Sequence, residues 1–565
     1  MSPRPIASPK QAWILTALIL LITFILLYSF TTTRSTLWDR DEPRFSRATV
    51  EMVNTGNYLV PHFNGKLRPD KPILIYWLMS IPVRIFGPTE FACRFFAPLA
   101  VLGTAILLPF IGGSLGHRRA GIFAMAILPA APLMIVSGTA ATTDAVLIFF
   151  IVLSLWLFLK LEAANNQAKR LRWMVLLGIS LGAAVLTKGP VGLAIPMFCF
   201  LGTIVLDQKN SFKKQRILYI GGATILAIGL FLAWAIPANL ASGGELARIG
   251  LGRHVVGRSL KAMEGHGGHA LLWLPFYIPI SVVGFFPWTL FFPAGWRALK
   301  KASSPGNPSK RFLLSWILPT FILMSLVATK LPHYILPIWP AFALMAGIGL
   351  EKELSHEKAE KLTANWDRWL ILPLGILLAI AFFIASFLSP LDGTSLPLIF
   401  VGLIFAGMTV WATLCFQKQM LLKAATILWC GMALFLATAS YAVLPKMEKT
   451  KISKPIAELV NQNNFSKTPV SVFGYREPSL VFYLNREEST YLSQDQEVSA
   501  WDQQSTPGIL IIRSKFLEKF RSKGGLTNTQ FLGEVSGINI AKEGRPIKVT
   551  VLGRHLPNPP ESPKK

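Results

Sequence analysis

Long apolar runs alternate with short polar segments along most of this chain, and this pattern predicts its architecture. A transmembrane helix needs about 20 predominantly apolar residues. Runs near that length occur at thirteen positions: about 13–30, 94–115, 120–136, 143–159, 173–187, 190–206, 217–237, 271–294, 312–329, 334–350, 369–388, 396–416 and 424–444. The chain is 52% hydrophobic with a mean hydropathy of +0.47, unlike an ordinary soluble enzyme. We therefore expect a polytopic α-helical membrane domain over residues 1–444, with about thirteen transmembrane helices. No small-residue cleavage site follows the first run, which favours an anchor over a signal peptide.

From residue 445 onward the composition becomes that of a soluble domain. Short β-type runs alternate with two helix-like segments, 456–461 and 514–521. The β-type runs are Val470–Phe473, Leu480–Leu484, Ile509–Ile512 and Lys548–Leu552. This pattern predicts that residues 445–565 form a small α/β domain ending in a proline-rich, disordered tail.

Basic residues are distributed unevenly between the polar segments. The alternate segments 1–12, 117–119, 160–172, 207–216, 295–311, 351–368 and 417–423 hold 23 Lys and Arg residues. By the positive-inside rule they face the cytoplasm, so the N-terminus is cytoplasmic and the C-terminal domain is periplasmic. The net charge of +27 is then explained by contact with anionic membrane lipids. Nucleic acid is excluded as a partner because the basic residues are scattered.

Two long outside loops, 34–93 and 238–270, carry basic residues against this trend. The first holds the sequence LWDRDEPRFSRATVEMVNTGNYLVPHFNGKLRPDKPILIYW at 37–77, with charges of both signs beside a membrane span. Pro43 suits the first position of a helix, and Gly56 suits its end. Asp41 then lies at the positive end of this helix, which favours an ionised carboxylate.

Further polar residues lie at outside span ends. Asp144 begins a span, where a helix cap is the simpler interpretation, and Lys188 and Lys330 end spans, where extending to the surface is the simpler one. Taken together, acids and cations from at least five segments converge on the outer face. The four cysteines lie in or at spans, which argues against disulfides and a cysteine metal site. No glycine-rich nucleotide motif occurs, so ATP and sugar nucleotides are poor donors.

The stretch DEPRFSRATVEMVNTGNYLVPHFNG…DKPILIYW resembles the first periplasmic loop of bacterial polyprenyl-phosphate-sugar glycosyltransferases. This family includes the aminoarabinose transferase that modifies lipid A, and protein O-mannosyltransferases are distant relatives. The resemblance covers roughly residues 35–445. It implies the C-type glycosyltransferase fold, an undecaprenyl-phosphate sugar donor, and an active site on the periplasmic side of the bacterial inner membrane.

The resemblance also implies roles for particular residues. Asp41 in DEPRF matches the catalytic aspartate and Asp144 a second family aspartate, while LTKGPVGLAIP at 186–196 and TKLPHYILP at 329–337 match further motifs. The substrate-binding residues expected on this basis are Glu42, Arg44, Lys71, Lys188, Arg258, Lys330 and Tyr334. Asp70 and His266 match the positions that hold a zinc ion in the aminoarabinose transferase, so a divalent metal is a candidate cofactor. Asp70 replaces the usual Glu of that motif.

The chemistry that suits these residues is sugar transfer from a lipid phosphate. Cations stabilise the phosphate leaving group, so no general acid is needed, and one carboxylate serves as base on the attacking hydroxyl. Direct displacement predicts inversion at the anomeric carbon. The expected acceptor is lipid A, with a protein or another envelope glycan as the alternative. A transporter or flippase is a second alternative, but it would place polar residues near the middle of the bilayer.

Overall fold

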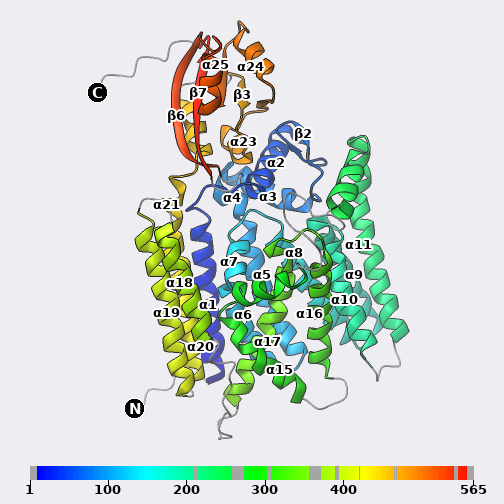
Figure 1. Cartoon of the computed structure of the whole chain (residues 1–565). Helices are drawn as coiled ribbons and strands as arrows, with labels where there is room; N and C mark the ends of the chain where they lie inside the picture. The colour runs from blue at the N-terminus through cyan, green and yellow to red at the C-terminus, as the bar shows by residue number, and fades with distance from the viewer. Residues whose placement is uncertain are drawn as a thin grey trace, which may run out of the picture.

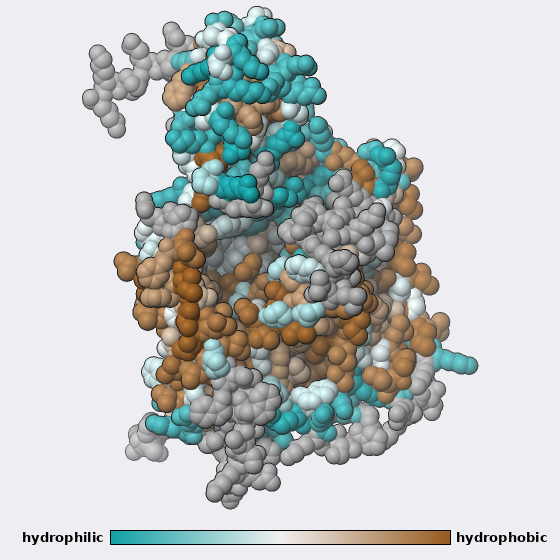
Figure 2. All heavy atoms as spheres, viewed as in Figure 1, coloured by the Kyte–Doolittle hydropathy of each residue, from teal (hydrophilic) through white to brown (hydrophobic). Residues whose placement is uncertain are grey.

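The structure is a computed structural model that describes residues 9–207, 213–257, 273–301, 307–355, 371–388, 393–418, 420–462, 465, 468–539 and 545–556. A helical body forms one end of the molecule and a small α/β domain the other, with α2, α3 and α4 between them (Figure 1). Brown hydrophobic side chains cover the body on the face drawn in Figure 2, whereas teal hydrophilic side chains cover the α/β domain. This distribution fits a helical body that lies in a bilayer.

Most segments of the helical body coincide with the apolar runs expected from the sequence. Its elements before residue 250 are α1 (Pro9–Thr31), α5 (Phe96–Ser114), α6 (Arg118–Ile127), η1 (Leu128–Ala130), α7 (Pro132–Gly138), α8 (Asp144–Glu162), α9 (Gln167–Lys188), α10 (Val191–Val205), α11 (Lys213–Ala241), α12 (Glu245–Ala247) and η2 (Arg248–Gly257). Those after residue 270 are η3 (Leu274–Phe276), α14 (Tyr277–Gly284), η4 (Trp288–Phe291), α15 (Phe292–Lys301), α16 (Pro308–Leu326), η5 (Pro332–Ile338), α17 (Trp339–Ser355), α18 (Ile371–Leu388), α19 (Ser395–Gln417), α20 (Leu421–Thr438), η7 (Ala439–Val443) and α21 (Leu444–Glu448).

Length and composition qualify eight helices of the described residues as membrane spans, and ten if two bent pairs each count as one. The bent pairs differ from the straight spans expected at 120–136 and 271–294. The first turns by 68° between η1 and α7, and the second by 101° between α14 and η4. Prolines explain both breaks, since Pro132 begins α7 and Pro287 precedes η4, and proline lacks the N–H that continues a helix.

The loop at 34–93 folds into a compact layer on the helical body. It contains α2 (Asp41–Thr55), β1 (His62–Phe63), β2 (Lys66–Leu67), α3 (Leu74–Phe86) and α4 (Glu90–Arg94). The expected helix at Pro43 is confirmed, and Gly56 ends it with a left-handed φ of 70°. Its apolar face is buried, with Phe45 4% exposed and Ala48 fully buried.

The C-terminal domain is a five-stranded sheet with helices on both faces. Its elements are α22 (Ser453–Gln462), β3 (Val470–Phe473), α23 (Pro478–Leu484), β4 (Thr490–Leu492), α24 (Asp495–Asp502), β5 (Gly508–Arg513), α25 (Ser514–Arg521), β6 (Thr529–Asn539) and β7 (Arg545–Arg554). The strand order is β4-β3-β5-β7-β6, parallel from β4 to β5 and antiparallel beyond. Buried residues of β5 alternate between two cores, Ile509 and Ile511 on one face and Leu510 and Ile512 on the other.

One strand expected in this domain is a helix instead. Residues 480–484 lie in α23, because Pro478 starts the helix and Leu480, Val481 and Leu484 are all buried. A short apolar run is compatible with either a buried strand or a buried helix, so its sequence alone did not distinguish them.

The C-terminal domain docks on the 34–93 layer through polar contacts. The Asp39 carboxylate accepts hydrogen bonds from the Ser479 backbone N–H, at 2.8 Å, and from the Ser479 hydroxyl. The Asn64 side-chain amide exchanges two hydrogen bonds of 2.8 Å with the backbone of Ser489. Arg47 donates to the Asn485 side-chain oxygen at 2.9 Å. These hydrogen bonds therefore fix the 34–93 layer, which carries Asp41, to the C-terminal domain.

Docking of the C-terminal domain is predicted to weaken as pH rises. Burial and the neighbouring Glu477 carboxylate raise the pKa of Asp39 to about 7, against the hydrogen bonds from Ser479, which lower it. The docked state therefore binds more protons than a free Asp39 between about pH 4 and pH 7, and its stability falls through that window. Hydrogen exchange of residues 476–484, corrected for intrinsic rates, should show more protection at pH 5 than at pH 8.

Asp39→Asn keeps a hydrogen-bond acceptor but does not titrate. Protection of 476–484 in this variant should not change between the two pH values, with peptides of β5 as an internal control. An unchanged pH difference in Asp39→Asn would contradict the assignment to this carboxyl.

Candidate functional site

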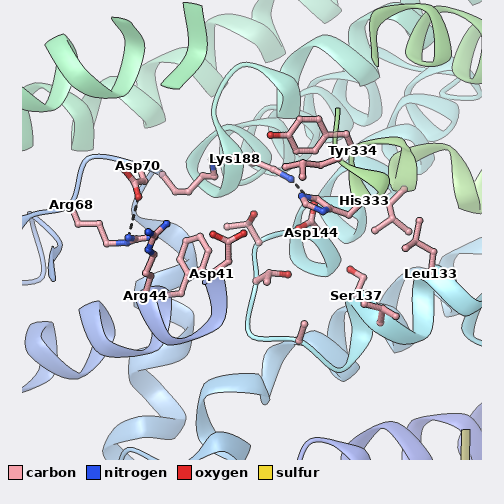
Figure 3. A pocket seen from close by; sticks show the side chains of 18 residues that line it. Asp41, Arg44, Arg68, Asp70, Leu133, Ser137, Asp144, Lys188, His333 and Tyr334 are labelled. Atoms are coloured by element: carbon pink, nitrogen blue, oxygen red, sulfur yellow. Dashed lines mark hydrogen bonds and ion pairs between the residues drawn. The ribbon is translucent and has the colours of Figure 1, made fainter. Parts of the chain in front are cut away.

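A pocket of about 850 Å³ lies between the 34–93 layer and the helical body (Figure 3). Its walls come from α2, the segment before α3, the α7–α8 connection, the end of α9, and η5. It is lined by Asp41, Arg44, Phe45, Arg68, Asp70, Lys71, Leu133, Val136, Ser137, Ala140, Thr142, Thr143, Asp144, Lys188, Leu331, His333, Tyr334 and Leu336. Seven of the residues singled out from the sequence therefore meet here, namely Asp41, Arg44, Asp70, Lys71, Asp144, Lys188 and Tyr334.

Asp41 reaches the pocket from the first turn of α2. Its side chain is solvent-exposed and points toward the opposite wall, which carries Asp144 and Lys188 (Figure 3). The unpaired N–H groups at this end of a 15-residue helix favour a negative charge. Asp41 is thus an accessible carboxylate that lines the pocket.

Asp144 is placed differently. It is the first residue of α8, and its carboxylate lies 2.5 Å from the Nζ atom of Lys188, the last residue of α9. Both side chains are largely buried, at 11% and 13% exposure. The Lys188 ammonium also lies 5.3 Å from the centre of the Tyr334 ring. Because Asp144 is held in a buried ion pair, it is a weaker candidate base than Asp41.

The other end of the pocket gathers cations near Asp70. Arg68 contacts the Asp70 carboxylate at 3.0 Å and donates to the Tyr76 hydroxyl at 3.2 Å. Burial lowers the pKa of the Arg68 guanidinium, but its neighbours Tyr76 and Asp70 raise it overall, so Arg68 remains charged. Arg44 and Lys71 line the same region. The pocket therefore offers a positively charged wall to an anionic substrate.

The metal site expected from the resemblance at Asp70 and His266 stays a prediction, because His266 lies outside the described residues. They contain no group of three or more His, Cys, Asp or Glu side chains that suits a metal ion, and the Asp70 carboxylate is bound by Arg68. Arg258 also lies outside the described residues, so its role stays a prediction. We derive no catalytic step through a metal.

Glu42 needs correction as an expected substrate-binding residue, because its carboxylate is buried behind the pocket. It accepts hydrogen bonds from Arg94 Nε and Nη2, at 2.8 and 2.7 Å, and from the backbone N–H groups of Trp38 and Ala141, at 2.8 and 2.6 Å. Burial raises the pKa of Glu42, but Arg94 and these hydrogen bonds together hold it below its usual value. With both oxygens occupied, Glu42 fixes the position of its neighbour Asp41.

Lys330 also needs correction, since its side chain turns away from the pocket. The ammonium is buried and donates to the backbone carbonyls of Met324, at 3.2 Å, and Ser325. Carbonyls at the end of a helix have no partner within the helix, so a lysine that follows α16 binds them readily.

Two ionisable residues of the pocket, Arg68 and His333, were missed in the sequence. Arg68 was noted only as part of a charged stretch, and His333 only as a letter within TKLPHYILP. His333 lies beside Asp144 and Lys188 in Figure 3. A lone histidine is more often structural than functional, so its residue type alone did not single out His333. The sequence signal that could have done so is its place beside Tyr334 in the TKLPHYILP motif.

The pocket continues into an apolar arm of about 980 Å³ between α8, α10 and α16. Leu147, Val191, Ala194, Leu323, Met324 and Val327 line this arm. Lys71, Asp144, Lys188, His333 and Tyr334 line both spaces, and we call these five residues the junction. A molecule with a polar head and an apolar tail would place its linking group at the junction.

Residues 13–243 match the family model described as Dolichyl-phosphate-mannose-protein mannosyltransferase. The match covers 231 of the 565 residues, less than half of the chain. Asp41, Lys71, Asp144 and Lys188 all lie within the matched part.

Two bacterial proteins are similar to this chain in sequence over more residues than the family model covers. The Undecaprenyl phosphate-alpha-4-amino-4-deoxy-L-arabinose arabinosyl transferase 2 of Proteus mirabilis (strain HI4320) is 30% identical over 345 residues, 59% of this chain and 59% of the relative. The chain thus spans about three fifths of this relative's length. An "Uncharacterized protein" of Aquifex aeolicus (strain VF5) is 27% identical over 83% of this chain and 87% of its own length.

Among solved structures, ArnT from Cupriavidus metallidurans bound to undecaprenyl phosphate superposes with a TM-score of 0.78 at 18% identity, covering 95% of this chain and 97% of that one. The expected C-type glycosyltransferase fold with a C-terminal α/β domain is therefore confirmed. At this identity the likeness concerns the fold.

Glu42 and Arg94 are predicted to be a structural pair. Removing one partner of a buried ion pair leaves an uncompensated charge, which typically costs about 3–5 kcal/mol. Arg94→Met should therefore lower the free energy of unfolding by about that amount, as measured by denaturant unfolding in mixed micelles.

The matched control is the exposed pair Lys519–Asp495, whose side chains are 47% and 46% exposed. Lys519→Met should change the free energy of unfolding by less than about 1 kcal/mol. Equal effects of the two substitutions would show that the buried pair has no special structural role.

Proposed function

We propose that this chain is a membrane glycosyltransferase that moves a sugar from a polyprenyl phosphate to an acceptor hydroxyl. The observation that carries the proposal is the junction, where a polar pocket with an accessible carboxylate meets an apolar arm. In the donor, a phosphate links the sugar to the isoprenoid chain. The sugar would lie in the pocket, the phosphate at the junction, and the isoprenoid chain in the apolar arm. The family match supports a lipid-phosphate donor.

Cations at the junction would stabilise the leaving group. Breaking the sugar–phosphate bond leaves the electron pair on a phosphate oxygen, which Lys71 and Lys188 are placed to stabilise electrostatically. Phosphate is a good leaving group when its charge is balanced, so this half of the reaction needs no general acid.

Asp41 would serve as the base. As the acceptor oxygen forms its bond to the anomeric carbon, its proton passes to the Asp41 carboxylate. Asp144 stays paired with Lys188 and orients it. One base and one direct displacement give inversion at the anomeric carbon.

The sugar and acceptor are proposed from the relatives. The names of the aminoarabinose transferases favour 4-amino-4-deoxy-L-arabinose or a related sugar on undecaprenyl phosphate. The resemblance of the first periplasmic loop favours lipid A as the acceptor. The description of the matched family favours a protein acceptor as the alternative. Mass spectrometry of lipid A from cells with and without this protein distinguishes the two.

Asp41→Asn is the direct test of the base. The amide keeps the shape of the side chain but accepts no proton, so turnover should fall about 10²–10⁴-fold while donor binding is largely kept. Sugar transfer from a purified polyprenyl-phosphate donor by folded protein in detergent measures this. Near wild-type turnover in Asp41→Asn beside an inactive Asp144→Asn would move the base to Asp144.

The proposed active site faces the periplasm of the bacterial inner membrane. If the thirteen apolar runs of the sequence each cross the membrane and the N-terminus is cytoplasmic, the pocket and the C-terminal domain lie on the same outer side. We expect a cysteine at the exposed position Ser522, in a Cys430→Ser background, to react with an impermeant maleimide from the periplasmic side. Labelling only after the inner membrane is opened would reverse this orientation.

A further inference from the structure

The junction has a charge balance that suits the donor better than the product. Among its described residues the fixed charges are Lys71, Lys188 and Asp144, and the last two form an ion pair. The net fixed charge is then +1. A glycosyl phosphodiester carries one negative charge, whereas the released polyprenyl phosphate is a monoester that carries about −1.5 to −2 near pH 7, since the second pKa of a phosphate monoester is about 6. Additional positive charge is needed as the sugar leaves.

His333 is the one described junction residue besides these fixed charges that can add a positive charge, since a protonated imidazole donates from both ring nitrogens. It lies at the start of η5, next to Tyr334, with the two ring centres 5.0 Å apart. The charged groups around it come from four elements: Asp144 on α8, Lys188 on α9, Asp41 on α2, and Lys71 before α3. Its ring therefore lies near two of the carboxylates and two of the cations that line the pocket.

Resting on the proposed function, we propose that His333 is a catalytic residue whose imidazolium donates a hydrogen bond to the phosphate as the second negative charge develops. The bond between the anomeric carbon and the phosphate oxygen breaks, and its electron pair stays on that oxygen. The acceptor oxygen bonds to the carbon and gives its proton to Asp41. His333 keeps its proton and stabilises the phosphate, so the atoms and charges balance without another reactant.

This role predicts that removing the His333 charge weakens binding of the product more than binding of the donor. His333→Gln keeps a neutral donor but lacks the charge, so it should weaken binding of undecaprenyl phosphate about tenfold at pH 6.5, the effect of losing one charge-assisted hydrogen bond. Donor KM should change by less than about threefold, because the diester has no second charge to balance, while kcat falls. His333→Lys, with a fixed charge, should restore product affinity and remove its fall between pH 6 and pH 8.

The binding probe is undecaprenyl phosphate added to the full-length protein in detergent. His117→Gln is the matched control, since His117 lies 3.3 Å from Glu351 and outside the pocket. His333→Asn serves as a second neutral variant, with thermal unfolding to verify that both are folded.

Three results would overturn the proposal. Equal losses for donor and product would make His333 a general structural contact, and unchanged product affinity in both neutral variants would remove it from the phosphate site. If either of these two results is found while the wild-type protein binds undecaprenyl phosphate, only the role of His333 is refuted and the proposed function stands. Wild-type protein that neither binds it nor transfers sugar would refute that function, and this inference with it.

Discussion

The buried ion pair between Glu42 and Arg94 joins the segments on which the site depends. Besides Glu42, the Arg94 guanidinium donates to the backbone carbonyls of Thr32, Ser35 and Thr36, at 2.9, 2.7 and 3.0 Å. Glu42 in turn accepts from Ala141, three residues before Asp144. One pair thus links the end of α1, the start of α2, α4 and the α7–α8 connection. Because a buried charge without its partner is so costly, these four segments keep one arrangement.

That arrangement separates two neighbouring acids with different tasks. Asp41 is left accessible at the end of α2, whereas Glu42 one residue later is buried and fully hydrogen-bonded. Across the pocket, Asp144 is buried with Lys188. Similar carboxylates therefore differ in availability because of their surroundings, as is common where one acid must exchange a proton and others must stay fixed.

The C-terminal domain adds a second constraint on the same segment. Asp39, two residues before Asp41, is bound by Ser479, and the Leu37 N–H donates to the Tyr483 hydroxyl at 2.8 Å. Lys451 lies 3.7 Å from the centre of the Trp38 ring. The segment from Leu37 to Asp41 is consequently held by the C-terminal domain on one side and by Arg94 on the other. This gives the α/β domain a structural connection to the pocket, although none of its described residues lines the pocket.

The sequence alone indicated where most membrane helices lie, which charges are unusual, and most of the ionisable residues of the pocket. Apolar periodicity is local, so the runs identified the membrane helices, and Pro43 and Gly56 marked the bounds of α2 within about two residues. Charges beside spans are costly, so Asp41, Asp144 and Lys188 stood out without any structure. Only the tertiary structure decided which charged residue faces the pocket and which is buried behind it. Asp41 and Glu42 are adjacent and chemically alike, and their roles differ because Arg94, 52 residues from Glu42, binds one of them. His333 lines the pocket and Lys330 does not, and a local pattern could not show this because it does not contain the surrounding segments.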